Sequence, residues 1–146
     1  MKAFKFKLHA ILALKSLAKN EALQVYNLAY HKRQALEAEA DSYKDNLYTL
    51  EKNIDRERQS LSVAHKNAYY MEVLEHEHLK LKCVNEKIQL VKKEEKAALQ
   101  DYLRAKQEEE MIKKMKVKLK EKHTSETNLT EAKELEEMMN QRFNAF

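Results

Sequence analysis

The chain has 146 residues, with 28 Lys and Arg against 24 Asp and Glu, and it contains no glycine, proline or tryptophan. Because glycine and proline supply the turns and rigid corners of multi-element folds, this composition excludes a compact α/β or all-β domain. Strong helix formers dominate and 36% of the residues are charged, which is typical of a long helix or coiled coil. The net charge of +4 argues against extensive nucleic-acid binding, and a single cysteine, Cys83, excludes an internal disulfide.

The first 33 residues are basic, with seven Lys and Arg against Glu21 alone. A short apolar run from Leu8 to Leu14 contains His9 and ends at Lys15, which indicates an amphipathic helix rather than a signal peptide. No stretch reaches the ~20 consecutive apolar residues that a membrane span needs. The basic segment has three interpretations: a solvated face, a contact with an acidic protein surface, or a site for nucleic acid or anionic lipid.

The first arm is expected over about residues 4–58 and carries two apolar stripes. The opening stripe comprises Ile11, Leu14, Ala18, Ala22, Val25, Ala29, Lys32 and Leu36. The second stripe comprises Ala40, Tyr43, Leu47, Leu50, Ile54 and Leu61. The stripes meet at two successive steps of four residues, which predicts a stutter that locally unwinds a supercoil.

A polar, cap-forming stretch at about 58–63 predicts a bend. It separates two arms of about 60 residues, each roughly 90 Å long at 1.5 Å per residue, which suits an antiparallel hairpin. The second arm is expected over about 63–122. The alternative is one continuous helix in a parallel dimer, since no glycine interrupts the chain.

A heptad repeat runs through the second arm and predicts a left-handed coiled coil. Nine of its twelve positions are apolar, and the set is Leu81, Val84, Ile88, Val91, Glu95, Ala98, Tyr102, Ala105, Glu109, Ile112, Lys116 and Leu119. The charged members Glu95, Glu109 and Lys116 indicate places where a partner protein, and not the other arm, matters.

Polar and β-branched residues at 123–128 predict a second break, followed by a short C-terminal helical segment at about 128–143. In such a hairpin the lysine-rich block Lys113–Lys122 lies beside the first dozen residues, at the open end. Tyrosines gather toward the bend: Tyr43, Tyr48, Tyr69 and Tyr70. Because Tyr69 and Tyr70 are adjacent, they cannot both face one partner helix, so at least one is exposed and able to bind a protein.

The sequence carries no catalytic, cofactor-binding or metal-binding pattern, and the chain is predicted not to be an enzyme. A glycine-rich phosphate loop is impossible without glycine. His76 and His78 lie about 200° apart on a helix, so they cannot share a metal ion. Glu108-Glu109-Glu110 is interpreted as a solvated face. We therefore expect neither a cofactor nor a small-molecule substrate.

Several short motifs resemble FliJ-type proteins, the small coiled-coil components of bacterial flagellar type III export. The opening Phe4-Lys5-Phe6-Lys7-Leu8 and the helical Ala35-Leu36-Glu37-Ala38-Glu39 are similar to the start of that family. Tyr69-Tyr70-Met71-Glu72-Val73-Leu74 after the bend and the acidic Glu134-Leu135-Glu136-Glu137 resemble its later segments. The family's usual glycine near the bend is missing.

The resemblance implies a two-helix antiparallel stalk in the cytoplasm, peripherally associated with the inner-membrane export apparatus. Its partners would be the hexameric flagellar export ATPase, whose assembly it promotes, the cytoplasmic domain of the export gate, and export chaperones. The ATPase-facing residues would be Leu8, Ile11, Leu12, Leu14, Lys15, Leu17, Leu135 and Met139. The gate-facing residues would be Tyr43, Leu47, Tyr70 and Leu74.

Two other interpretations stay open from the sequence. One is a generic structural coiled-coil dimer or scaffold. The other is the equivalent stalk of a virulence type III secretion system.

Overall fold

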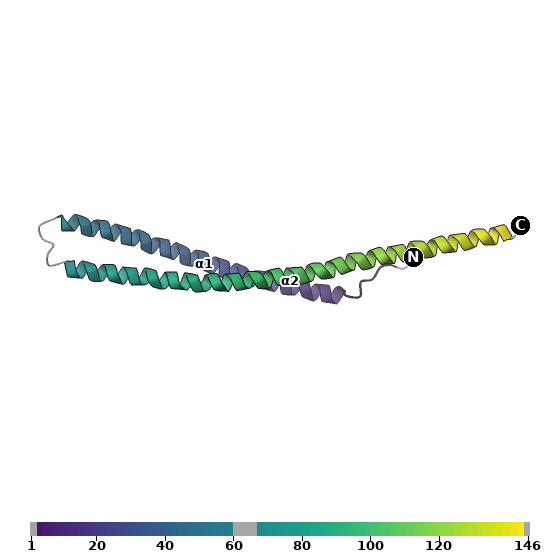
Figure 1. The fold of residues 1–146 in the computed structure, drawn as a ribbon, viewed down its shortest axis with the longest axis horizontal. Coiled ribbons are helices and arrows are strands. Elements are labelled where there is room, and N and C mark those ends of the chain that lie inside the picture. The colour runs from purple at the N-terminus through teal and green to yellow at the C-terminus, as the bar shows by residue number, and fades with distance from the viewer. Residues whose placement is uncertain (1–2, 60–66, 145–146) are drawn as a thin grey trace. The chain divides into compact units, whose positions relative to one another are not determined.

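The computed structural model describes residues 3–59 and 67–144, and within them two helices and no strand (Figure 1). Helix α1 spans His9–Arg58 and helix α2 spans Asn67–Asn144. The predicted bend at about 58–63 falls largely on residues 60–66, outside the described residues.

The two helices pack antiparallel. As residue numbers rise along α1, the numbers of the α2 residues that they contact fall. Lys19 contacts Glu109, and Arg33 contacts Glu95. The predicted all-α, two-helix antiparallel coiled-coil hairpin is therefore confirmed. We call the heptad positions of each helix that face the other helix the seam.

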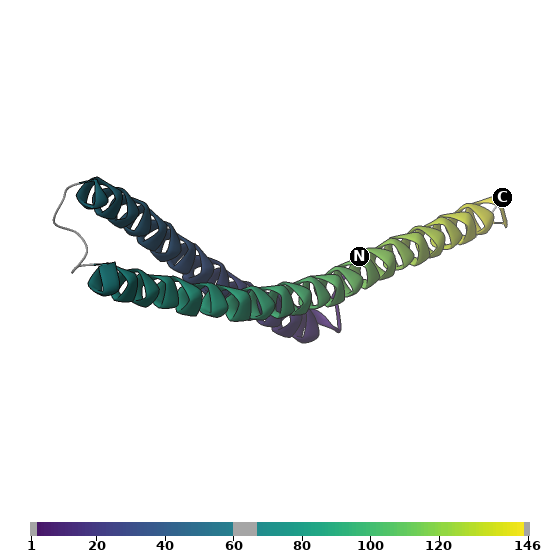
Figure 2. The ribbon, with the colours of Figure 1, turned by 60° about the vertical axis from the view of Figure 1, so that its left-hand side comes forward.

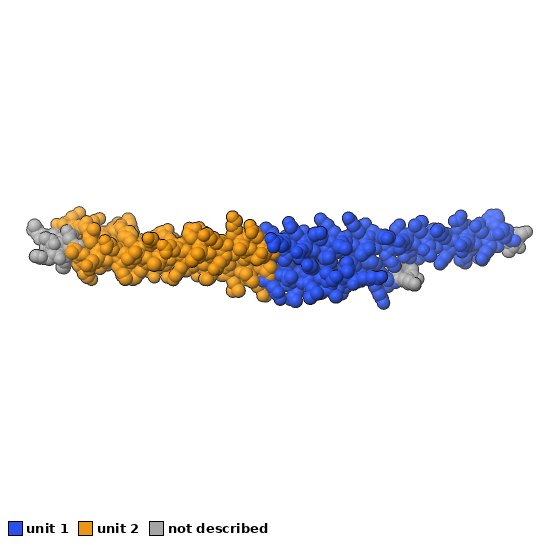
Figure 3. Space-filling view, turned by 60° about the horizontal axis from the view of Figure 1, so that its bottom comes forward, with its two compact units in different colours: residues 1–21, 102–146 blue, residues 22–101 orange. Residues whose placement is uncertain are grey.

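The contacts divide the chain into two compact units (Figure 3). Unit 1 comprises residues 1–21 and 102–146, and unit 2 comprises residues 22–101. The single coiled-coil domain expected from the sequence thus consists of two units, each with its own pairing of α1 and α2 segments.

The seam of α2 lies where its heptad repeat predicts. Of the twelve predicted positions, only Leu119, at 43% exposure, is classed as exposed. In unit 2, Val84 and Ile88 are buried against Ala40 of α1, and three partly buried residues pack around them: Leu36, Tyr43 and Leu81. Burial of this apolar surface stabilises the hairpin.

In the first half of α1 the observed seam differs from the predicted opening stripe. Thirteen of its buried or partly buried positions alternate by three and four residues without a stutter: Leu12, Lys15, Lys19, Ala22, Tyr26, Ala29, Arg33, Leu36, Ala40, Tyr43, Leu47, Leu50 and Ile54. Four other partly buried residues lie beside this row: Ser16, Leu23, Tyr30 and Glu37. Ile11, Leu14 and Val25 of the predicted opening stripe are instead exposed, as are Ala18 and Lys32. The second stripe is placed as predicted from Ala40 to Ile54, and Leu61 lies outside the described residues.

The start of α1 and the end of α2 also differ from the predicted bounds of the two arms. Helix α1 begins at His9, whose backbone N–H donates to the carbonyl of Phe6, so residues 3–8 precede the helix. The predicted break at 123–128 is wrong, because α2 continues through it. The hydroxyls of Thr124, Thr127 and Thr130 donate to the carbonyls four residues earlier at 2.8–3.0 Å, so these polar groups find their partners within the continuous helix.

We expect Ile88→Ala to lower the free energy of unfolding by about 2–3 kcal/mol, because it removes a buried side chain and leaves a cavity. Urea denaturation followed by circular dichroism measures the change. The matched control is Leu90→Ala, two residues away on α2 at 61% exposure, which should change stability by less than about 0.5 kcal/mol. Equal losses in the two variants would contradict the packing described here.

Candidate protein-binding surface

A buried carboxylate sits in the seam of unit 1. Glu109 of α2 is only 2% exposed, and Lys19 of α1 lies 3.0 Å from its Oε2. Lys113, one turn along α2, lies 2.8 Å from its Oε1. Hydrogen bonds from Lys113, Lys19 and Ser16 lower the pKa of Glu109 to about 2, against an ordinary 4.5. A second pair, Lys15 with Glu108 at 2.9 Å, lies beside it.

A second charged pair sits in the seam of unit 2. The Arg33 guanidinium donates from Nε and from a terminal nitrogen to the two oxygens of Glu95, and also to Glu37 at 3.0 Å. Hydrogen bonds to Glu95 and then to Glu37 raise the pKa of Arg33 further above its already high value. Arg33 also lies over the ring of Tyr30, 5.3 Å from its centroid. Such forked contacts to a carboxylate are directional as well as strong.

These pairs overturn the interpretation that charged seam positions of α2 await another protein. Glu95 and Glu109 are both met by basic seam residues of α1, two heptads apart on each helix. Lys116, the third charged position, lies 5.9 Å from the ring centroid of Phe6. The ring of Phe4 lies 5.6 Å from that of His123. The predicted meeting of the two basic blocks at the open end is thereby confirmed within unit 1.

The eight predicted ATPase-facing residues all belong to unit 1 but do not form one patch. Leu8 and Leu12 are partly buried, and Lys15 is bound to Glu108. Ile11, at 40% exposure, Leu14, at 65%, and Leu17, at 55%, face solvent.

Leu135 and Met139 are also exposed, at 62% and 59%, but they lie farther along α2. The segment before α1 contacts α2 at His123, where the ring of Phe4 lies beside the imidazole. At 1.5 Å per residue, Leu135 is about 18 Å beyond this level. Unit 1 therefore carries two separate exposed apolar surfaces.

The four predicted gate-facing residues lie mostly in the seam of unit 2. Leu47 is 6% exposed and Tyr43 packs against the core, so neither is freely accessible in the hairpin. Tyr70 and Leu74 are partly buried.

The predicted gate-facing set leaves out the two most accessible tyrosines of this unit. These are Tyr69, at 64% exposure, and Tyr48, at 60%. Exposure of one member of the Tyr69–Tyr70 pair was predicted and is confirmed. The heptad phase provides the signal for both, because neither residue occupies a seam position.

Residues 3–59 and 67–144 contain no cluster of three or more His, Cys, Asp or Glu side chains able to hold a metal ion. Neither described helix contains a stretch long and apolar enough to cross a membrane. No family model, curated protein or solved structure matches this chain.

The lowered pKa of Glu109 predicts acid sensitivity of the hairpin. A group whose pKa falls on folding contributes stability above its unfolded pKa, here near 4.5, and loses it as the pH drops toward 2. The urea midpoint should therefore fall between pH 5 and about pH 2, and Glu109→Gln should show a smaller fall.

Glu110→Gln is the matched control, since Glu110 is the exposed neighbour of Glu109. Its pH profile should follow that of the unmodified chain. If Glu109→Gln also followed the unmodified chain, the buried ionic contact would not operate in solution.

Proposed function

We propose that this chain is a non-catalytic stalk of the bacterial flagellar type III export apparatus, acting in the cytoplasm at the inner membrane. The proposal combines the two-helix hairpin with the resemblance of Phe4-Lys5-Phe6-Lys7-Leu8 and of Tyr69-Tyr70-Met71 to FliJ-type proteins. The main support is the exposure of Leu14 and Leu17 on α1, because other residues of this helix already fill the seam with α2. Single exposed apolar side chains are ordinary, but adjoining ones mark protein contacts, and Ile11, Leu14 and Leu17 follow one another at three-residue intervals along α1.

The charged seam favours a single-chain hairpin over the parallel dimer. In an in-register parallel dimer each seam residue faces its own copy. Glu109 would then face Glu109, and Arg33 would face Arg33. Buried like charges are strongly unfavourable, whereas the hairpin pairs Glu109 with Lys19 and Arg33 with Glu95. This argues against the generic dimeric scaffold, and the stalk of a virulence system remains the second candidate on the same observations.

In the proposed mechanism unit 1 engages the hexameric export ATPase. The exposed face of α1 with Leu14 and Leu17 contacts the ring subunits, and the basic block Lys113–Lys122 suits an acidic protein surface. An asymmetric hairpin in a symmetric ring biases its subunits toward assembly. The chain itself does no chemistry.

Unit 2 engages the cytoplasmic domain of the export gate in the same proposal, and export chaperones bind the hairpin. Tyr70 and Leu74 are retained from the sequence-based set because part of each side chain reaches the surface. Tyr69 joins them because its ring lies 6.0 Å from that of Tyr70 and is largely exposed. Exposed tyrosines are frequent hot-spot residues.

ATP hydrolysis by the purified export ATPase, measured with and without this chain, tests the proposal. We expect the chain to raise the hydrolysis rate and the ring fraction, and Leu14→Ser with Leu17→Ser to weaken that effect about tenfold. Leu28→Ser is the control, since Leu28 is 72% exposed on the same helix but lies in unit 2. A rate and an oligomeric state unchanged by the unmodified chain would refute the stalk role.

A further inference from the structure

The C-terminal part of α2 is a helix without a partner in the described structure. Every residue from 128 to 144 is exposed, and no other described segment lies beside these turns (Figure 2). Leu129, Met139 and Phe143 are 59%, 59% and 82% exposed. A helix this apolar on one side is expected to bury that side against another helix.

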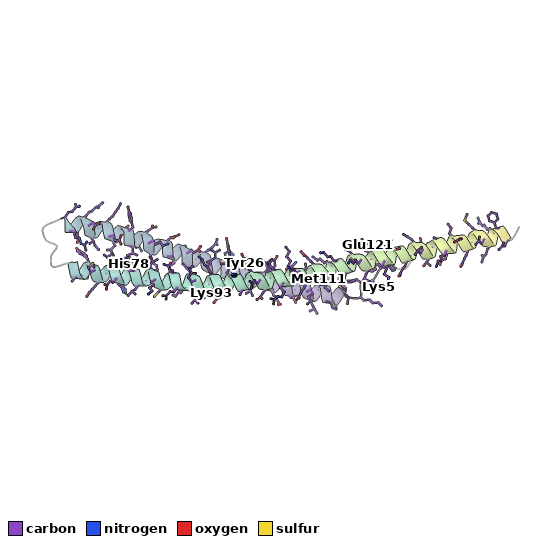
Figure 4. All side chains as sticks on the ribbon, in the orientation of Figure 1. Lys5, Tyr26, His78, Lys93, Met111 and Glu121 are labelled. Carbon is purple, nitrogen blue, oxygen red and sulfur yellow. The ribbon has the colours of Figure 1, made fainter. Side chains whose placement is uncertain are left out.

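These residues belong to a second heptad stripe on α2, separate from the seam. The stripe begins at Met111, labelled in Figure 4, and alternates by four and three residues. Its members are all exposed: Met111, Met115, Lys118, Lys122, Ser125, Leu129, Ala132, Glu136, Met139 and Phe143. All ten lie in unit 1. Six of the ten members are apolar and four are polar, namely Lys118, Lys122, Ser125 and Glu136, so the stripe has apolar ends and a largely polar middle.

The stripe is complementary to the same stripe of a second copy that runs antiparallel to it. When two copies are placed antiparallel and centred on residue 127, Met111 faces Phe143 and Met115 faces Met139. In the same alignment Lys118 faces Glu136, and the two-fold symmetry repeats each contact. Lys122 faces Ala132, and Ser125 faces Leu129. Apolar thus meets apolar at both ends, and the glutamate of the stripe meets a lysine.

The surrounding charges agree with this alignment. Residues 113–122 hold six lysines and one glutamate, and the alignment brings them level with residues 132–141 of the other copy. That stretch holds three glutamates and one lysine. The opposite, parallel arrangement would place the lysine-rich blocks beside each other, which like-charge repulsion disfavours.

We propose that the chain self-associates through this stripe, with the C-terminal part of α2 from two copies pairing antiparallel about residue 127. The hairpin of each copy stays intact, because the stripe uses no seam position. The inference does not rest on the proposed export function. Self-association covers Met139, one of the residues assigned to the ATPase, so the two interactions compete for that surface.

Sedimentation equilibrium of the full chain over a range of concentrations tests the inference. We expect a 17.3 kDa monomer in dilute solution that converts to twice that mass as the concentration rises. Lys118→Glu alone and Glu136→Lys alone should each weaken dimerisation roughly tenfold, since each places like charges opposite one another twice. Both residues are exposed, so the hairpin of each variant should fold normally.

The most direct form of this experiment mixes the two single variants. In a heterodimer of Lys118→Glu with Glu136→Lys, both contacts become a glutamate opposite a lysine, so dimerisation should return to within about threefold of the unmodified chain. Lys120→Glu is the control, because Lys120 lies on the same helix outside the stripe, and it should change dimerisation less than about twofold. A monomer at every concentration, or a mixture no tighter than the single variants, would overturn the inference.

Discussion

The buried contact between Lys19 and Glu109 and the forked contact between Arg33 and Glu95 determine how the two helices align. Both carboxylates lie within the seam, where a charge without a partner is costly. A slip of one heptad would bring Leu12 or Tyr26 opposite Glu109, so the carboxylate would lose Lys19 and keep only the contact with Lys113 of its own helix. An apolar heptad repeat alone tolerates such slips far better. These two contacts therefore specify one antiparallel register, and the surface of the hairpin follows from that register.

The exposure of Leu14 and Leu17 is a direct consequence of this constraint. Because Lys15 and Lys19 occupy the side of α1 that faces α2, the large apolar residues beside them are turned outward. The same helix thus carries a charged inner side and an apolar outer side near its start. This inversion of the usual pattern supplies unit 1 with a surface for other proteins. The proposed contacts with the ATPase and with a second copy of the chain both use unit 1.

The heptad phases of α2 and of the second half of α1 could be predicted from the sequence, whereas that of the first half of α1 could not be predicted from apolarity. Nine of twelve positions in the α2 repeat are apolar, so only one phase satisfies it. In the first half of α1, the stripe through Ile11, Leu14 and Val25 is more apolar than the true seam. Basic residues with the spacing of Glu95 and Glu109 occur early in the chain as Lys5 with Lys19 and as Lys19 with Arg33. Both pairs give the correct phase, but the spacing alone does not choose between their two registers. Similarly, the polar and β-branched residues at 123–128 suggested a break, but the hydroxyls of Thr124 and Thr127 bond within the helix.

The register described here requires that α1 and α2 of one chain pair antiparallel, with Lys19 beside Glu109 and Arg33 beside Glu95. Spin labels at Leu28→Cys on α1 and Gln100→Cys on α2, in a Cys83→Ser background, report on it within unit 2, and all three positions are exposed. Pulsed dipolar spectroscopy on labelled chains diluted in an excess of unlabelled chains should give a narrow distance near the width of two packed helices, about 20 Å. A longer distance, or loss of the signal on dilution, would contradict the single-chain hairpin.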